Sequence, residues 1–255
     1  MLWYKSWLET RWRFLIGLAL LMLSAASTVI GYPQVVKLLG HVPPIDLGGE
    51  IGRQVKQSME LARDYRGYVW SQVFLKNMPQ QWVLFAALLG TGGLLPQSSG
   101  GGGLFTLSLP VSRNRLLGAR AATGLAELLA LAVVPSLLLP LLSPAIGQHY
   151  GIGDAVIHGV CLFIAGSMFF SIALWLSTVF GDVWRPWLIV CCAAVVLALL
   201  ELVSHDLSRL SVFRVMSAEV YFRGGGLPWL GLLASASVSA AVLYAAARNF
   251  ARRDF

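Results

Sequence analysis

The sequence predicts an all-α protein that crosses a membrane about six times. Hydrophobic residues make up 57% of its 255 residues and charged residues only 12%, whereas an ordinary soluble domain contains about 25% charged residues. The mean hydropathy is +0.71. Because each span takes about 20 apolar residues, little of the chain is left for a separate soluble domain. We therefore expect a single polytopic membrane domain over residues 1–255.

Six apolar blocks are long enough to be transmembrane helices. They cover residues 14–30, 81–95, 121–142, 154–180, 186–203 and 227–247. The third block contains Pro135 and Pro140 near its end, where we expect the helix to kink or stop. The last block is rich in serine and alanine, including Ser235 and Ser239, and such small residues suit close packing against another helix.

The residues before the first block, 1–13, alternate tryptophan and tyrosine with charged side chains. Helical spacing would place Trp3 and Trp7 on one face and Lys5 and Arg13 elsewhere, as in a helix that lies in the membrane interface. The alternative interpretation is a charged flank of the first span. A small-residue cleavage site is not evident, so we expect the first span to be retained as an anchor.

The longest polar stretch, residues 33–79, is expected to form an extracytoplasmic loop. It begins with the turn-rich sequence HVPPIDLGG. From Glu50 to Lys76, apolar residues recur every three or four positions, which predicts one or two amphipathic helices. The sequence leaves open whether this loop is only a solvated connection or a lateral gate.

The net charge of +7 is explained by membrane orientation rather than by nucleic-acid binding, because the basic residues lie at the ends of apolar blocks and not in one run. Six spans put both termini on the same side. The positive-inside rule places them in the cytoplasm, together with the cations Lys5, Arg11, Arg13, Arg113, Arg115, Arg120, Arg185, Arg248, Arg252 and Arg253.

Residues 104–120, LFTLSLPVSRNRLLGAR, form a basic, proline-interrupted segment between two apolar blocks. We expect this segment to lie on the cytoplasmic membrane surface. It follows the sequence PQSSGGGG, in which Gly100, Gly101, Gly102 and Gly103 are consecutive. A phosphate-binding loop would require a lysine after the glycines, so this run is interpreted as a hinge and not as a nucleotide site.

Glu127, Asp154 and His158 are ionisable residues that lie inside or beside the apolar blocks. Glu127 lies in the third block, where a charge costs about 3 kcal/mol on insertion scales. We interpret it as structural, reaching interfacial water or a neighbouring cation, with a place on a transport pathway as the alternative. Asp154 and His158 are four residues apart. The favoured interpretation makes Asp154 a helix cap and His158 an interfacial residue, and the alternative is a proton or ion site.

Enzyme and metal chemistry find little support in the sequence. The cysteines Cys161, Cys191 and Cys192 all lie in apolar runs without CxxC spacing, so we expect no metal or redox site. The chain contains neither HExxH nor GxSxG, two motifs of catalytic sites. An intramembrane enzyme is therefore the least favoured class, behind a stand-alone secondary transporter or channel.

Two stretches resemble the ABC type-2 (ABC-2) permease family, the membrane subunits of ABC transporters that mostly export. They are YVWSQVFLKNMPQQWVLFAALLG, at the end of the first outer loop, and LFTLSLPVSRNRLLGAR, in which SLPVSR (108–113) is the most specific element. In such permeases this phrase belongs to the cytoplasmic loop or coupling helix that docks on the ATPase. Together with the six expected spans, the resemblance covers nearly the whole chain.

The resemblance implies a permease in a bacterial cytoplasmic (inner) membrane that binds no cofactor of its own. ATP and Mg would be bound by a separate ABC ATPase partner, and a second permease copy would complete the pathway, most simply as a homodimer. Docking residues implied by the match are Ser108, Pro110, Ser112, Arg113 and Arg115. The alternative for these arginines is that they only hold the loop at anionic headgroups.

Overall fold

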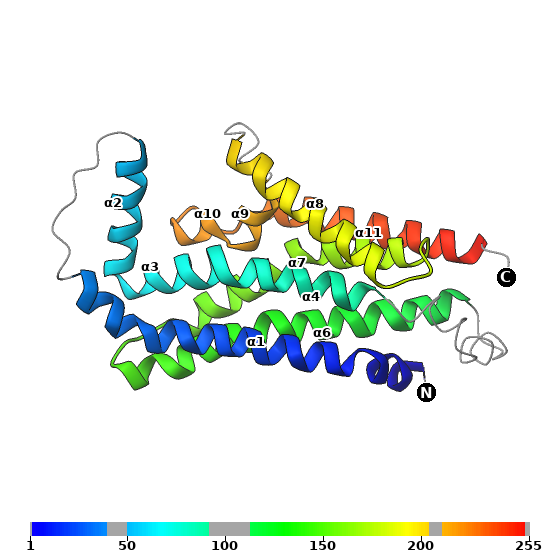
Figure 1. Ribbon diagram of the computed structural model, residues 1–255, viewed down its shortest axis with the longest axis horizontal. Coiled ribbons are helices and arrows are strands. Elements are labelled where there is room, and N and C mark those ends of the chain that lie inside the picture. Colours follow the sequence, from blue (N-terminus) through cyan, green and yellow to red (C-terminus); the bar gives the residue numbers. More distant parts are fainter. Residues whose placement is uncertain (1, 40–49, 92–112, 204–210, 253–255) are drawn as a thin grey trace.

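The computed structural model describes residues 2–39, 50–91, 113–203 and 211–252 (Figure 1). Every regular element in these ranges is a helix. Five of the helices are long and apolar enough to cross a membrane. They are α1 (Leu2–Leu39), α6 (Arg113–Leu142), α7 (Ile152–Ser177), α8 (Trp184–Val203) and α11 (Trp229–Arg252). The protein is therefore an all-α, multi-pass membrane protein.

A further helical rod is assembled from three consecutive elements. These are α3 (Tyr65–Val69), the π-helix η1 (Trp70–Asn77) and α4 (Met78–Gly90). The rod begins well before the expected second span, residues 81–95, and its last turn ends at Gly90, followed by Thr91 in an extended conformation. The aromatic residues at the start of the rod are buried against other helices, which explains why this part of the chain joins the bundle instead of forming loop.

Helix α1 is longer than the expected first span at both ends. It continues through Pro33 to Leu39, so the first residues of the expected outer loop are helical. It also includes the predicted interfacial segment without an interruption in the helix, although in Figure 1 the first turns point in a different direction from the rest. Trp3 and Trp12 are exposed on these turns, as expected for side chains at headgroup depth.

Helix α6 continues through both of its prolines. Pro135 and Pro140 lie inside the helix, which ends at Leu142 and tightens into the short 3-10 helix η3 (Ser143–Ile146). The prolines therefore do not stop the helix early. Helix α7 then begins after Gly151, which occupies the N-cap position in place of the expected Asp154.

The two chain ends lie at the same end of the bundle (Figure 1). This end also holds the end of α4 and the beginnings of α6 and α8. The opposite end holds η3 and the two short helices α9 (Val212–Met216) and α10 (Glu219–Phe222). At that end α2 (Glu50–Arg63) stands across the direction of the long helices.

Helix α7 is the centre of the bundle, with α4, α6 and α11 packed around it. Close approach of these helices requires small residues. A Cβ atom at Gly166 of α7 would lie 2.1 Å from the ring of Trp82 in α4, and one at Gly124 of α6 would lie 2.5 Å from Phe170 in α7. Trp82 and Phe170 are fully buried, so the glycines and large rings interlock to form the core.

Only some of the small residues of α11 pack against another helix, although this was expected of all of them. Ser239 and Ser167 of α7 share a hydrogen bond between their hydroxyl oxygens, 3.0 Å apart. Ser235, one turn earlier, is also buried, whereas Ala236 and Ser237 are exposed. The contact with α7 is thus a narrow stripe along one face of α11.

Candidate functional site

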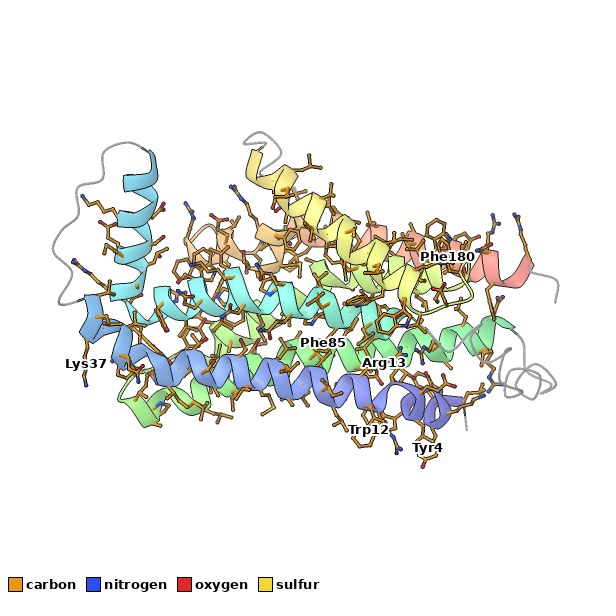
Figure 2. The ribbon with its side chains drawn as sticks, viewed as in Figure 1. Tyr4, Trp12, Arg13, Lys37, Phe85 and Phe180 are labelled. Atoms are coloured by element: carbon orange, nitrogen blue, oxygen red, sulfur yellow. The ribbon has the colours of Figure 1, made fainter. Side chains whose placement is uncertain are left out.

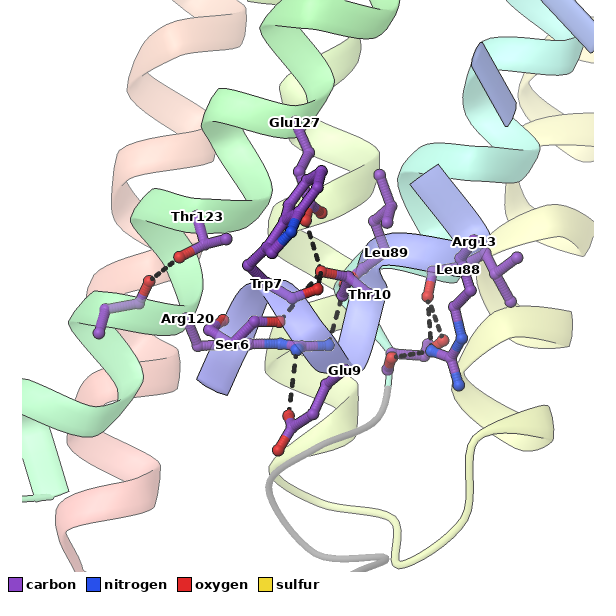
Figure 3. Close-up of polar contacts among 12 residues, drawn as sticks. Ser6, Trp7, Glu9, Thr10, Arg13, Leu88, Leu89, Arg120, Thr123 and Glu127 are labelled. Atoms are coloured by element: carbon purple, nitrogen blue, oxygen red, sulfur yellow. Dashed lines mark hydrogen bonds and ion pairs between the residues drawn. The ribbon is translucent and has the colours of Figure 1, made fainter. Parts of the chain in front are cut away.

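A polar cluster is enclosed where α1, α4 and α6 meet, at the end of the bundle that holds the termini (Figure 3). We call this the inner polar cluster. It comprises Glu9, Thr10 and Arg13 of α1 and Arg120 and Glu127 of α6. Figure 2 shows Arg13 pointing between α1 and α4, whereas Tyr4 and Trp12 point away from the bundle. The cluster therefore connects helices that are far apart in the sequence.

Arg13 binds the carboxyl end of α4. Its Nη1 atom donates to the carbonyl oxygens of Thr91 at 2.8 Å and Leu88 at 3.2 Å. The last carbonyl groups of a helix have no partner within the helix and carry partial negative charge. A guanidinium at this point satisfies them and fixes the end of α4 to α1.

Arg120 binds the same end of α4 from α6. Its side chain is only 7% exposed and lies 3.4 Å from the carboxylate of Glu9. Its Nη2 atom donates to the carbonyl oxygen of Leu89 at 3.4 Å. A buried charge requires a partner because its desolvation is costly, and here the partners come from α1 and α4. Arg120 thereby links three helices.

Glu127 lies seven residues after Arg120, which corresponds to about 10 Å along a helix. It is 4% exposed, and its Oε1 atom accepts a hydrogen bond from the hydroxyl of Thr10 in α1. Its Oε2 atom is buried and has no protein partner among the described residues. The position agrees with a structural role between α1 and α6, while a place on a transport pathway stays a prediction.

The described residues do not include the predicted hinge or three of the five predicted docking residues. These are Gly100, Gly101, Gly102 and Gly103 of the hinge and Ser108, Pro110 and Ser112 of the docking segment. Arg113 is the first residue of α6, and its side chain is not among those described. Arg115 is exposed on the first turn of α6. The structure thus continues the segment directly into α6, the helix that carries the inner polar cluster.

Arg120 was expected to be a cytoplasmic cation like Arg113 and Arg115, but it is buried. One feature of the sequence distinguishes Arg120 from Arg113 and Arg115. Arg120 and Glu127 are seven residues apart, so on a helix they lie on nearly the same face, two turns from each other. A matching pair in α1, Glu9 and Arg13, is four residues apart. Paired charges on two helices favour contact between those helices.

A second group of polar residues occupies the opposite end of the bundle. Asp154 of α7 receives a two-point contact from the Arg66 guanidinium, with Nε 3.0 Å from Oδ2 and Nη2 3.3 Å from Oδ1. The Tyr221 hydroxyl also donates to Oδ1 at 2.8 Å. This bond raises the pKa of Tyr221 above its ordinary value, so the phenol stays a donor. Asp154 is thus a junction of three elements and not the helix cap that we expected.

His158 lies one helical turn after Asp154 in α7, and its expected position near the membrane interface stays a prediction. Its side chain is fully buried, with the ring centroid 4.5 Å from that of Phe74 and 5.7 Å from that of Tyr221. Both ring nitrogens lack a protein partner among the described residues. The neighbouring Tyr150 hydroxyl is buried without a partner as well, and burial raises the pKa of this phenol.

An apolar groove of about 410 Å³ lies between α4 and α8. Val83 and Leu84 of α4, Ala194 and Val195 of α8 and Phe213 of α9 line most of it, and Gln80 is its polar member. Toward the opposite end from the termini, the same rod exposes Lys76 one turn before Gln80 and partly exposes Gln72 one turn before that.

The described part of the chain contains no group of three or more histidine, cysteine, aspartate or glutamate side chains that could hold a metal ion. The three cysteines are free thiols, and Cys161 is buried, whereas Cys192 is exposed. Comparison with protein-family models, with curated proteins and with solved structures finds no significant match to this chain. The geometry above is therefore the basis for a functional proposal.

Proposed function

We propose that this chain is the permease subunit of an ATP-driven exporter, similar to the ABC type-2 permeases, in a bacterial cytoplasmic membrane. Two copies would form the pathway, and a separate ABC ATPase would hydrolyse ATP. The observation that carries the proposal is that the end of the basic segment, residues 113–120, forms the start of α6. Arg120 in this part of the helix is bound to α1 and α4.

Because the segment continues into α6, a movement of the segment would also move the helices that are bound to α6. Arg115 is exposed five residues before the buried Arg120, about 8 Å along the helix. A partner that displaces the first turn of α6 would also displace the helices to which Arg120 and Glu127 are bound. The inner polar cluster would thus transmit partner movement to α1 and to the rod that ends in α4.

The proposal includes six spans, with the rod 65–90 as the additional one. Its 26 residues correspond to about 39 Å of helix, which exceeds the hydrocarbon thickness of about 30 Å. With six spans both termini lie in the cytoplasm, as the positive-inside rule favours.

The exposed polar face of the rod supports a pathway between two copies. Gln72, Lys76 and Gln80 recur every four residues on a helix inside the bundle's length. Polar groups at membrane depth are costly when they face lipid and mark water-filled or protein-covered surfaces. A second copy across this face would cover them, and the groove between α4 and α8 would adjoin the same space.

A stand-alone secondary transporter or channel is the second candidate. It is favoured by Glu127 and by the pair Asp154 and His158, which are ionisable groups within or close to the spans. An intramembrane enzyme has less support because its catalytic constellation is not evident in the sequence.

The proposal is tested by the double substitution Arg113→Glu with Arg115→Glu. We expect the wild-type chain to co-purify with an ABC ATPase encoded beside it and the double variant to lose most of this association. Charge-dependent docking also predicts that ATP hydrolysis by the remaining complex is no longer coupled to transport.

A matched control reverses two exposed arginines at the same end of the bundle, Arg248→Glu with Arg252→Glu in α11. This variant has the same change in net charge and should keep the ATPase bound. Equal loss in both variants would indicate a general effect of charge on membrane orientation. Normal assembly and transport in the Arg113 and Arg115 variant would contradict the docking role.

A further inference from the structure

The short helix α10 covers a buried histidine at the end of the bundle opposite the termini. The ring of Tyr221 of α10 lies nearly perpendicular to that of His158, and the ring of Phe74 of the π-helix η1 also packs against the imidazole. The His158 side chain is fully buried. A neutral imidazole has one donor and one acceptor, and neither ring nitrogen has a protein partner among the described residues.

This environment disfavours a charged ring. Transfer of an ionised group from water to a buried site is costly unless the group is paired. The nearest carboxylate, Asp154, lies one turn before His158 on the same face of α7, but both of its oxygens are already engaged by Arg66 and Tyr221. The closed arrangement therefore holds His158 as a neutral imidazole.

Side-chain contacts at its exposed surface hold α10 in place, among them the Arg66 guanidinium over the Phe222 ring, 5.6 Å from its centroid, and the ion pair of Glu219 with Arg214. None of its four residues is buried. The Phe222 ring stacks on Trp70 with the centroids 4.2 Å apart, and the Tyr221 hydroxyl binds Asp154. The residue before the helix, Ala218, has a φ of 51°, a left-handed conformation that is unfavourable for alanine. The neighbouring α9 is better anchored, because Val215 and Met216 are buried.

We propose that His158 is a proton-binding site that α10 closes, so that acidification on this side of the membrane favours an open α10. When α10 moves away from His158, water reaches the imidazole and stabilises its charged form. A proton then binds the open form more tightly than the closed form, and mass action shifts the population toward the open form as the pH falls. This inference is independent of the identity of the exporter's partner.

The charged groups that face this site are paired with one another. Asp154 and Arg66 are the charges closest to His158, and within the covering segment Glu219 pairs with Arg223 at 2.6 Å and with Arg214 at 3.5 Å. Between about pH 7.5 and pH 5 histidine is the side chain that changes charge.

The test is amide hydrogen–deuterium exchange of the purified full-length protein in lipid nanodiscs. The reporters are the amides of Phe222, Arg223, Gly224 and Gly225, each of which donates to a carbonyl within residues 218–221. After correction for intrinsic exchange, we expect exchange of this peptide to rise about fivefold from about pH 7.5 to about pH 5. His158→Phe, which keeps an aromatic ring but does not titrate, should abolish the rise.

Three further variants make the result decisive. His158→Gln repeats the test with a neutral polar side chain in case Phe disturbs packing. His149→Phe removes an exposed histidine nearby and should leave the rise intact. Tyr221→Phe, which loses the bond to Asp154, should increase exchange at both pH values. A pH rise that persists without His158, the absence of a rise in the wild type, or unchanged exchange in Tyr221→Phe would each overturn the proposal.

Discussion

At the residue scale, long-range polar contacts hold both ends of the bundle. Arg120 reaches Glu9, 111 positions away, and Arg66 reaches Asp154, 88 positions away. The contribution of such a contact to stability depends on how deeply its side chains are buried. The Arg120 side chain is 7% exposed and that of Arg66 is 47% exposed. Exposed ion pairs contribute little, whereas breaking a buried one leaves an uncompensated charge.

Substitution of Arg120 tests the inner polar cluster. Arg120→Leu should lower the free energy of unfolding by about 3 kcal/mol, because Glu9 loses its cation and the carbonyl of Leu89 loses a donor. Arg115→Leu, on the exposed face of the same helix, should change it by less than about 0.5 kcal/mol. Reversible unfolding in mixed micelles measures both.

A double-mutant cycle then isolates the pair itself. If Arg120 and Glu9 interact, Glu9→Gln with Arg120→Leu should cost about 1 kcal/mol less than the sum of the single changes. Strict additivity would contradict the contact, and an equal effect of Arg115→Leu would show that the loss comes from helix α6 in general and not from the cluster.

The sequence predicts which ionisable residues matter better than it predicts their partners. Glu127 was expected to reach interfacial water or a neighbouring cation, whereas its hydrogen-bond partner is the hydroxyl of Thr10. Arg120 could not be told from Arg115 by residue type, because the burial of a charge depends on which helices pack against it. For the same reason Asp154 looked like a cap, since its partners Arg66 and Tyr221 lie in other elements.

At the element scale, the close contact of α4 and α7 depends on glycine. The Trp82 side chain occupies the place where a side chain at Gly166 would begin, with 2.1 Å between the ring and an added Cβ atom. Trp82 is fully buried and has no room to move aside. The contact positions the rod that carries the exposed Lys76 and the groove against α8.

We therefore expect Gly166→Ala to destabilise the protein by about 2 kcal/mol, because overpacking forces Trp82 or the backbone to shift. Gly118→Ala is the matched control. Gly118 also lies in a long helix, α6, but an added Cβ atom there meets nothing within 4 Å. This substitution should be neutral or stabilising by up to about 1 kcal/mol, the propensity difference between the two residues. Thermal unfolding in detergent distinguishes the two, and equal effects would contradict the packing argument.

The long apolar helices were predictable, and the rod was predictable in part. Its second half overlaps the expected span 81–95, and its first half lies in the stretch where amphipathic helices were expected. Hydropathy located α6, α7, α8 and α11 to within a few residues at most ends, because a run of about 20 apolar residues has few alternatives to a membrane helix. The rod starts at Tyr65 among polar residues such as Arg66 and Gln72, which lower its hydropathy. Tyr68 packs against Tyr32 of α1, and Phe74 packs against His158 of α7. The apolar period of this stretch indicates an amphipathic helix, but it does not show that the helix continues into the span.

At the scale of the whole molecule, the number of crossings decides the orientation. The described helices place both termini at one end of the bundle (Figure 1). If the rod 65–90 crosses the membrane with the five long helices, the termini share a compartment. If it does not, the termini lie on opposite sides. Orientation in turn decides whether Arg113 and Arg115 face the cytoplasm, where an ATPase could reach them.

Single-cysteine labelling separates these possibilities. In a background with the substitutions Cys161→Ala, Cys191→Ala and Cys192→Ala, one cysteine is placed at an exposed position, namely Tyr4, Gln148, Gly181 or Arg248. Six spans with cytoplasmic termini predict that a membrane-impermeant maleimide modifies only the cysteine at position 148 in spheroplasts and modifies the other three after permeabilisation. Labelling at position 4 but not at position 248, or the reverse, would instead establish an odd number of crossings. Labelling at 4, 181 and 248 but not at 148 would keep six spans and invert the protein, which would remove the docking surface from the cytoplasm.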